Sequence, residues 1–162
     1  MLAKEILREL QSYIDKNYLS FMPAESAPFM IAETLHNELE DFIEGNRKPA
    51  FSETLMKFID KSGLSDSQVY RKAGIDRRHF SKIRSNAEYK PGKNTVISLA
   101  LALELDQNET KELLSSAGYS LSKSDLSDLI ILFFIERRIY KIDDINYALE
   151  YFGLKPIGGA IE

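Results

Sequence analysis

Residues 63–83 read GLSDSQVYRKAGIDRRHFSKI, and this stretch decides the fold. Ser65 with Gln68 three residues later forms a capping-box pattern, which begins a helix that Gly74 ends. Asp76 is a good N-cap for a second helix directly after that glycine. The stretch therefore predicts two short helices joined by a tight turn.

Helical patterns continue on both sides of this pair, and strand-like alternation is nearly absent. Upstream we expect a helix within the first twenty residues, a second over about 29–44, and a third capped by Ser52 and ended by Gly63. Downstream we expect a helix over about 94–105, one that Asp106 with Glu109 signals and Gly118 ends, one from near Ser124, and one over about 143–151. The sequence predicts an all-α fold.

The bulk composition excludes several classes of protein. The chain has 162 residues, 44% of them hydrophobic, which is enough for one small domain with appendages. It has no cysteine, so disulfides and thiolate chemistry are excluded. The longest apolar run, Leu129 to Ile135, is far shorter than the roughly 20 residues that span a bilayer. We expect a cytoplasmic protein without membrane contact.

Positive charge is concentrated in one segment. Between residues 67 and 98 the chain has eight lysines and arginines against two acids, a net charge of +6. The whole chain carries −4, so the remainder carries −10. Residues 25–44 alone hold six acids and no lysine or arginine. A basic segment inside an acidic protein indicates an anionic partner for that segment.

The helix after Asp76 has two distinct faces. At 100° per residue, its basic and hydroxyl side chains fall within one arc of about 140°. These residues are Arg77, Arg78, Ser81, Lys82 and Ser85. Phe80 and Ile83 fall on the opposite side as an apolar anchor. Arginine can bond to guanine edges in a DNA groove, although exposed helix faces are commonly charged without any such role.

Several motifs resemble the lambda-repressor-like (Xre-type) helix-turn-helix domain. They are Gly63-Leu64-Ser65, Gly74-Ile75, Phe80-Ser81-Lys82-Ile83, and Pro91 followed by Val96, Ile97, Leu99, Ala100, Ala102 and Leu103. The resemblance covers residues 51–118. It implies that the helix over 76–85 is a recognition helix and that the start of the Ser65 helix contacts a DNA phosphate.

A narrower resemblance covers about residues 51–157. The phrases VYRKAGIDRRHFSKIRSN and DLIILFFIERRIYKIDDIN resemble a group of bacterial proteins in which this helical unit stands alone or follows macro or von Willebrand A domains. This resemblance implies no function. The expected organisation is an acidic helical arm over 1–48, a helix-turn-helix domain over 51–118, and a two-helix extension over 119–157 packed on it.

Two residues depart from the repressor pattern. Tyr70 stands where a small alanine is usual, and Ala73 is the small residue instead. Asp66 stands where a DNA-facing glutamine is common, and a carboxylate there repels phosphate. Both departures weaken the expectation of DNA binding.

Other site chemistry finds little support in the sequence. His36 and His79 lie far apart, no spacing suits a metal, and no phosphate-binding loop occurs, so we expect no metal, cofactor, small-molecule ligand or enzymatic activity. Serines at 120–127 are expected to supply helix caps. Six aromatic residues near the C-terminus are expected to lie mostly in the core, with any exposed part forming a partner surface: Phe133, Phe134, Tyr140, Tyr147, Tyr151 and Phe152.

The leading hypothesis is a non-enzymatic protein that binds double-stranded DNA, as a transcriptional regulator does. Arg77, Arg78, Ser81 and Lys82 would face the bases. The phosphate-facing candidates are Ser65, Gln68, Arg71, Lys72, Arg84, Lys90 and Lys93. The alternative is an interaction adaptor that keeps the fold without DNA binding and uses its basic segment on an acidic protein surface. A homodimer would use the N-terminal arm or the aromatic C-terminal helices, because no heptad seam is present.

Overall fold

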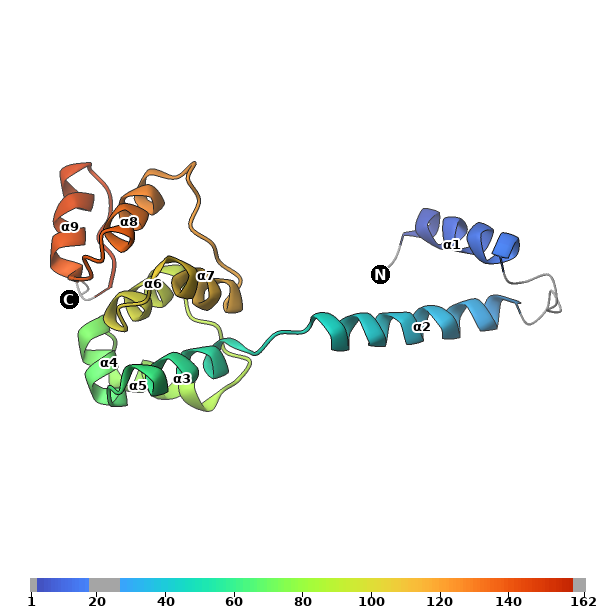
Figure 1. Ribbon diagram of the computed structural model, residues 1–162, viewed down its shortest axis with the longest axis horizontal. Helices are drawn as coiled ribbons and strands as arrows, with labels where there is room; N and C mark the ends of the chain where they lie inside the picture. Colours follow the sequence, from blue (N-terminus) through green and yellow to red (C-terminus); the bar gives the residue numbers. More distant parts are fainter. Residues whose placement is uncertain (1–2, 18–26, 159–162) are drawn as a thin grey trace. The chain divides into compact units, whose positions relative to one another are not determined.

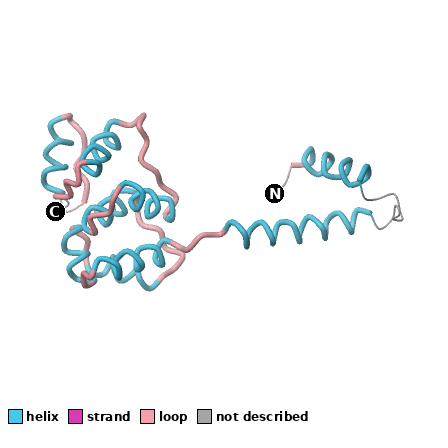
Figure 2. Tube along the Cα trace, in the orientation of Figure 1, coloured by secondary structure: helices cyan, strands magenta, loops and turns pink. Residues whose placement is uncertain are grey.

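A computed structural model describes residues 3–17 and 27–158 of the chain. Every regular element in these ranges is an α-helix, which confirms the all-α prediction (Figure 2). No helix in the same ranges is long and apolar enough to cross a membrane. The chain separates into two compact units, residues 1–47 and residues 48–162.

The first unit contains two amphipathic helices, α1 (Lys4–Asn17) and α2 (Ala27–Asn46) (Figure 1). The acidic segment of the sequence lies mainly on α2. Leu39, Phe42 and Ile43 of α2 are about half exposed. The apolar stripe that predicted this helix is therefore largely open to solvent.

The second unit contains α3 (Phe51–Ser62), α4 (Asp66–Ala73), α5 (Arg77–Ser85), α6 (Lys93–Ala102), α7 (Gln107–Ser116), α8 (Leu126–Glu136) and α9 (Ile142–Tyr151). The central element is α6, in which residues 96–102 are all buried. A helix that is apolar on every side has to be surrounded by others. Accordingly α6 packs against both α4 and α7, and α3 packs against α5 and α7.

Charged pairs join the exposed edges of α3 and α7. Lys61 Nζ donates to Glu109 Oε2 at 2.9 Å, and Lys57 pairs with Glu112 one turn along both helices. The hydrogen bond and negative charge of Glu109 raise the pKa of Lys61 above its ordinary value. Both lysines and Glu112 are more than half exposed, so the pairs contribute little to stability.

Three helix starts were predicted correctly from their caps. Ser65 and Gln68 form a reciprocal capping box at α4, as do Asp106 and Glu109 at α7. The Asp76 side chain accepts a hydrogen bond from the Arg78 N–H at the start of α5. In each case a side-chain oxygen satisfies a backbone N–H that has no partner within the helix.

Other boundary predictions were wrong. The N-cap of α3 is Ala50, without a side-chain cap, and Ser52 is buried within the helix. Asp125, rather than a serine, caps α8. The helix predicted over 94–105 ends at Ala102, because Glu104 adopts a left-handed conformation with φ of 53°. A non-glycine residue in that region ends a helix as a C-cap glycine does.

The C-terminal helices α8 and α9 lie side by side and are tied back to the bundle by the segment that follows them. The Asn146 side chain donates to the Ile157 carbonyl at 3.0 Å and accepts from the Ile157 N–H at 2.8 Å. Ile157 is buried, and Gly158 lies directly against Ser98 of α6 and the Ala73 carbonyl of α4. The tail after α9 is therefore part of the core.

Candidate nucleic-acid interface

Helices α4 and α5 are joined by three residues, Gly74–Asp76. Gly74 has φ of 70°, and the Ile75 N–H donates to the Tyr70 carbonyl at 2.8 Å, which closes the end of α4. This left-handed C-cap turns the chain sharply enough for α5 to fold back on α4. Tyr70, the large residue in place of a small one, packs its ring on Phe80 with centroids 5.6 Å apart.

The two faces predicted for α5 are present. Phe80 and Ile83 are buried at 3% and 0% exposure. The side chains predicted for the outer face are all exposed: Arg77, Arg78, Ser81, Lys82 and Ser85. The helix thus presents a basic and hydroxyl surface while its apolar side anchors it to the bundle.

The basic side chains on this face differ in their interactions with the rest of the protein. Among the described residues, the side chains of Arg77 and Arg78 make no hydrogen bond or ion pair. Lys82 Nζ lies 4.5 Å from the centre of the Tyr89 ring. The Tyr89 hydroxyl in turn lies 3.0 Å from His79 Nε2. The two arginines are free to bind an external group, whereas Lys82 is positioned by an aromatic ring.

Tyr89 was not predicted as part of this surface. It lies in the loop after α5, where its N–H donates to the Asn86 carbonyl at 3.1 Å and turns the loop back toward the helix. An aromatic residue ten positions after a histidine carries no helical periodicity. Only the fold of the loop brings His79 and Tyr89 together.

The side chains of Ser65 and Gln68 each accept a hydrogen bond from the other residue's backbone N–H. Gln68 N donates to Ser65 Oγ at 3.2 Å, and Ser65 N donates to Gln68 Oε1 at 2.9 Å. The amide nitrogen of Gln68 remains available as a donor in this arrangement. The capping box therefore leaves the Gln68 amide nitrogen able to donate to a phosphate, as predicted for this position.

Two predicted phosphate-facing cations are already paired with acids. Arg84 forms an ion pair with Asp66, and Lys72 Nζ lies 3.3 Å from Glu104 Oε2. All four side chains are at least one third exposed, so each pair exchanges readily with solvent or a competing anion. The sequence does not reveal either pair, because their partners lie 18 and 32 residues apart.

Lys93 lies in a different environment from the other basic residues. Its Nζ donates to Asp128 Oδ2 at 2.7 Å, and the Asp128 side chain is 5% exposed. The same carboxylate oxygen accepts from the Ser122 N–H at 2.8 Å. Lys93 thus joins α6 to α8 and is the most enclosed of the predicted phosphate contacts. Arg71 and Lys90 are exposed and have no side-chain partner among the described residues.

A second surface lies on the C-terminal helices. Leu129, Ile130, Phe133 and Phe134 of α8 and Ala148 of α9 line an apolar groove of about 360 Å³, with Phe152 beyond the end of α9. The expectation that the six C-terminal aromatic residues lie mostly in the core was wrong. Four of them are exposed by 47–78%: Phe133, Tyr147, Tyr151 and Phe152. The helices are too short and too few to bury so many rings.

Comparison with known proteins adds no relative to this description. No protein-family model matches the chain, and neither a curated protein nor a solved structure does.

Proposed function

We propose that α4, the Gly74–Asp76 turn and α5 form a helix-turn-helix of the lambda-repressor type, and that the chain binds double-stranded DNA through α5. The observation that carries this proposal is the pair of exposed arginines in the first turn of α5, which have no side-chain partner in the described part of the chain and lie beside an exposed serine and lysine. The N-terminal turn of a recognition helix is the part that reaches base edges.

Each basic residue has a stated role in the proposal. Arg77 and Arg78 contact base edges, where a guanidinium can bond to guanine O6 and N7 at once. Ser81 and Lys82 extend the same face. Arg71 and Lys90 contact phosphates, and Lys72 and Arg84 join them when DNA displaces their carboxylate partners. Lys93 keeps its ion pair with Asp128 and stabilises the fold without contacting DNA.

Asp66 is less unfavourable to DNA binding than its position in the sequence suggests. Its charge is balanced by Arg84 within the same two-helix unit. A paired carboxylate produces a much smaller repulsive field than an isolated one, since the opposite charges cancel beyond a few ångströms. The basic surface therefore retains a positive character next to Asp66.

The test is a fluorescence-anisotropy titration with random-sequence duplex DNA at two salt concentrations. We expect micromolar binding that weakens steeply with salt, as counterion release requires. The variant Arg77→Ala/Arg78→Ala/Lys82→Ala should lose it. The matched control Lys123→Ala/Lys141→Ala/Lys155→Ala removes the same charge from the C-terminal extension and should keep it. Equal losses in both variants, or no binding at low salt, would overturn the proposal.

The second candidate function is an interaction adaptor without DNA binding, and the apolar groove on α8 and α9 favours it. Exposed aromatic rings of this kind are enriched in protein interfaces and are costly to leave in water. A homodimer through these helices would serve either function. Sedimentation of the wild-type chain and of Phe133→Asp tests for such a dimer, which would dissociate in the variant, and a wild-type dimer that binds no DNA would favour the adaptor.

A further inference from the structure

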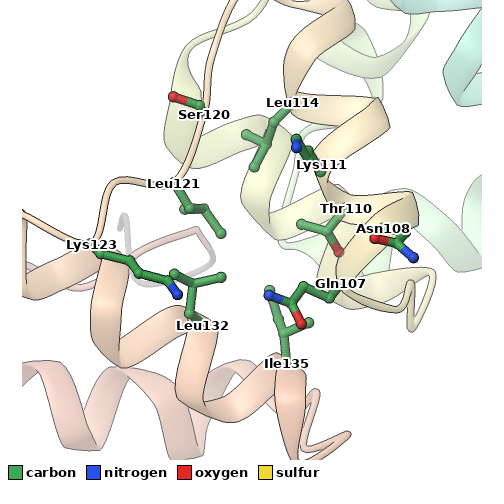
Figure 3. Close-up of a pocket in the computed structure, with 10 residues that line it drawn as sticks. All are labelled: Gln107, Asn108, Thr110, Lys111, Leu114, Ser120, Leu121, Lys123, Leu132 and Ile135. Atoms are coloured by element: carbon green, nitrogen blue, oxygen red, sulfur yellow. The ribbon is translucent and has the colours of Figure 1, made fainter.

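We propose that a pocket between α7 and α8 binds a small organic anion, a function independent of DNA binding. The pocket has a volume of about 260 Å³ and lies between α7, the segment that follows it, and α8 (Figure 3). Drug-sized ligands occupy roughly 300–1,000 Å³, so this space suits a smaller molecule. One water fills about 30 Å³ of liquid, and the pocket is several times larger than that.

The polar lining of the pocket combines nitrogen donors with the hydroxyl and amide groups of Asn108, Thr110 and Ser120. Gln107 and Lys111 come from α7, and Lys123 comes from the segment before α8. In Figure 3 the Lys123 side chain extends toward Leu132, and the Gln107 amide lies across the space from it. Neither lysine has an ion-pair or hydrogen-bond partner among the described residues.

None of the described residues that line the pocket is an acid, although the chain has an excess of acids. The nearby acids of α7 are engaged elsewhere. Glu109 and Glu112 pair with lysines of α3, and the Asp106 side chain caps the helix. Among the described residues no acid forms an ion pair with either ammonium group, and an anion is the ligand whose charge they complement.

The apolar part of the wall is formed by Leu114, Leu121, Leu132 and Ile135. Leu114 and Ile135 are buried at 1% and 2% exposure, and Leu132 is half-buried beside them. A ligand with only charge, such as chloride, leaves this wall in contact with water. An anion with a short apolar body covers it and gains the burial energy as well. The chemistry fits a small aromatic or branched aliphatic carboxylate.

The test uses benzoate as the probe and benzyl alcohol as its neutral counterpart of similar shape. The full chain, labelled with ¹⁵N, is titrated with each compound while amide shifts are recorded. We expect benzoate to shift amides of α7, residues 118–125 and α8, and to raise Tm because it binds only the folded state. Benzyl alcohol should do neither at the same concentration.

Two variants keep the test decisive. Lys111→Gln/Lys123→Gln should weaken benzoate binding about tenfold or more, the effect of losing about 1.4 kcal/mol of charge interaction. The control Lys141→Gln/Lys155→Gln removes two exposed lysines outside the pocket and should bind as the wild type does. Leu132→Trp fills the space without changing charge and should also abolish binding.

Three results would overturn the inference. They are equal shifts with benzyl alcohol, benzoate shifts that map outside the pocket, and unchanged affinity in the double lysine variant. The lysines are exposed, so their replacement by glutamine is not expected to unfold the chain.

Discussion

Asp66, the first residue of α4, forms an ion pair with Arg84 in the last turn of α5. The contact joins the far ends of the two helices in the proposed helix-turn-helix. It also balances the one carboxylate that lies at the start of α4. The pair therefore affects how much positive charge this surface presents to an anion.

Replacing Asp66 with asparagine should strengthen DNA binding. Arg84 loses its carboxylate partner and gains freedom to reach a phosphate, while one negative charge disappears. We expect the slope of log affinity against log salt to steepen by about 0.9, the value for one added phosphate contact. Anisotropy titrations over a salt series measure it. Glu150→Gln, an equal charge change on α9, is the control, and an identical gain there would refute a local effect.

Arg77→Ala and Lys90→Ala should affect DNA binding differently. A base-reading arginine contributes about 1–3 kcal/mol of discrimination, so its loss should relax sequence preference. A phosphate-contacting lysine should weaken all sequences alike. Selection of bound sequences from a random pool, followed by titration of the best and worst, measures both. Equal losses on every sequence in both variants would count against base reading by Arg77.

Asp128→Ala should destabilise the fold. The buried carboxylate accepts hydrogen bonds from Lys93 Nζ and from the Ser122 N–H, and its removal leaves both donors without it. Because the Lys93 side chain is 34% exposed and can be hydrated, the expected loss is about 1–3 kcal/mol, the cost of leaving the hydrogen-bond donors unsatisfied. Urea unfolding followed by circular dichroism measures the loss. The exposed Asp143→Ala on α9 should change the free energy of unfolding by less than about 0.5 kcal/mol. Similar losses in both variants would contradict the role of Asp128.

Gly158→Ala should destabilise the chain more than Gly153→Ala. Both glycines have positive φ, 48° and 74°, so both variants incur backbone strain. A Cβ at Gly158 would lie 2.2 Å from Ser98 Oγ, whereas nothing lies within 4 Å of one at Gly153. Thermal unfolding compares the two. Adding Ser98→Ala should recover part of the Gly158→Ala loss, and strict additivity would contradict the steric contact.

Tyr140→Phe should leave stability unchanged or raise it by up to about 1 kcal/mol at neutral pH. The Tyr140 hydroxyl is buried without a hydrogen-bond partner among the described residues, so its removal loses no bond.

The same variant has a predicted pH dependence. Burial raises the pKa of Tyr140 above its ordinary value of 10.0, so the folded chain holds this proton more tightly than the unfolded chain does. Below pH 10 both states hold the proton. As pH rises above 10 the unfolded chain loses the proton first, so the free energy of unfolding falls. The difference in unfolding free energy between the wild type and Tyr140→Phe should be flat below pH 10 and change above it. A difference that stays flat to pH 11 would contradict the shift.

The sequence was most informative where structure depends on neighbouring residues. The capping boxes of α4 and α7 and the turn at Gly74 each involve positions within four residues of one another, and the two faces of α5 lie within its nine residues. Caps and helical periodicity are local, so a sequence displays them directly. The cap predicted at Ser52 was wrong because the sequence does not distinguish a serine buried inside a helix from a serine that caps one.

The partners of the site residues could not be predicted. Lys93 with Asp128, Arg84 with Asp66, and Lys82 with Tyr89 each depend on how separate elements pack. Charge counts treat all eight basic residues as equivalent, whereas the fold leaves Arg71, Arg77, Arg78 and Lys90 without partners among the described residues. The pocket between α7 and α8 could not be predicted for the same reason, since its lining residues extend from 107 to 135.

The packing of Gly158 against Ser98 and Ala73 also affects when the core is completed during synthesis. Gly158 follows these residues by 60 and 85 positions in the chain. At about 5–20 residues per second, a ribosome needs roughly 2–8 seconds to add the 40 residues after Gly118. During that interval α4 and α6 exist without the tail that covers them. Until the tail has been synthesised, the surfaces of α4 and α6 that it covers remain exposed to solvent and to other molecules.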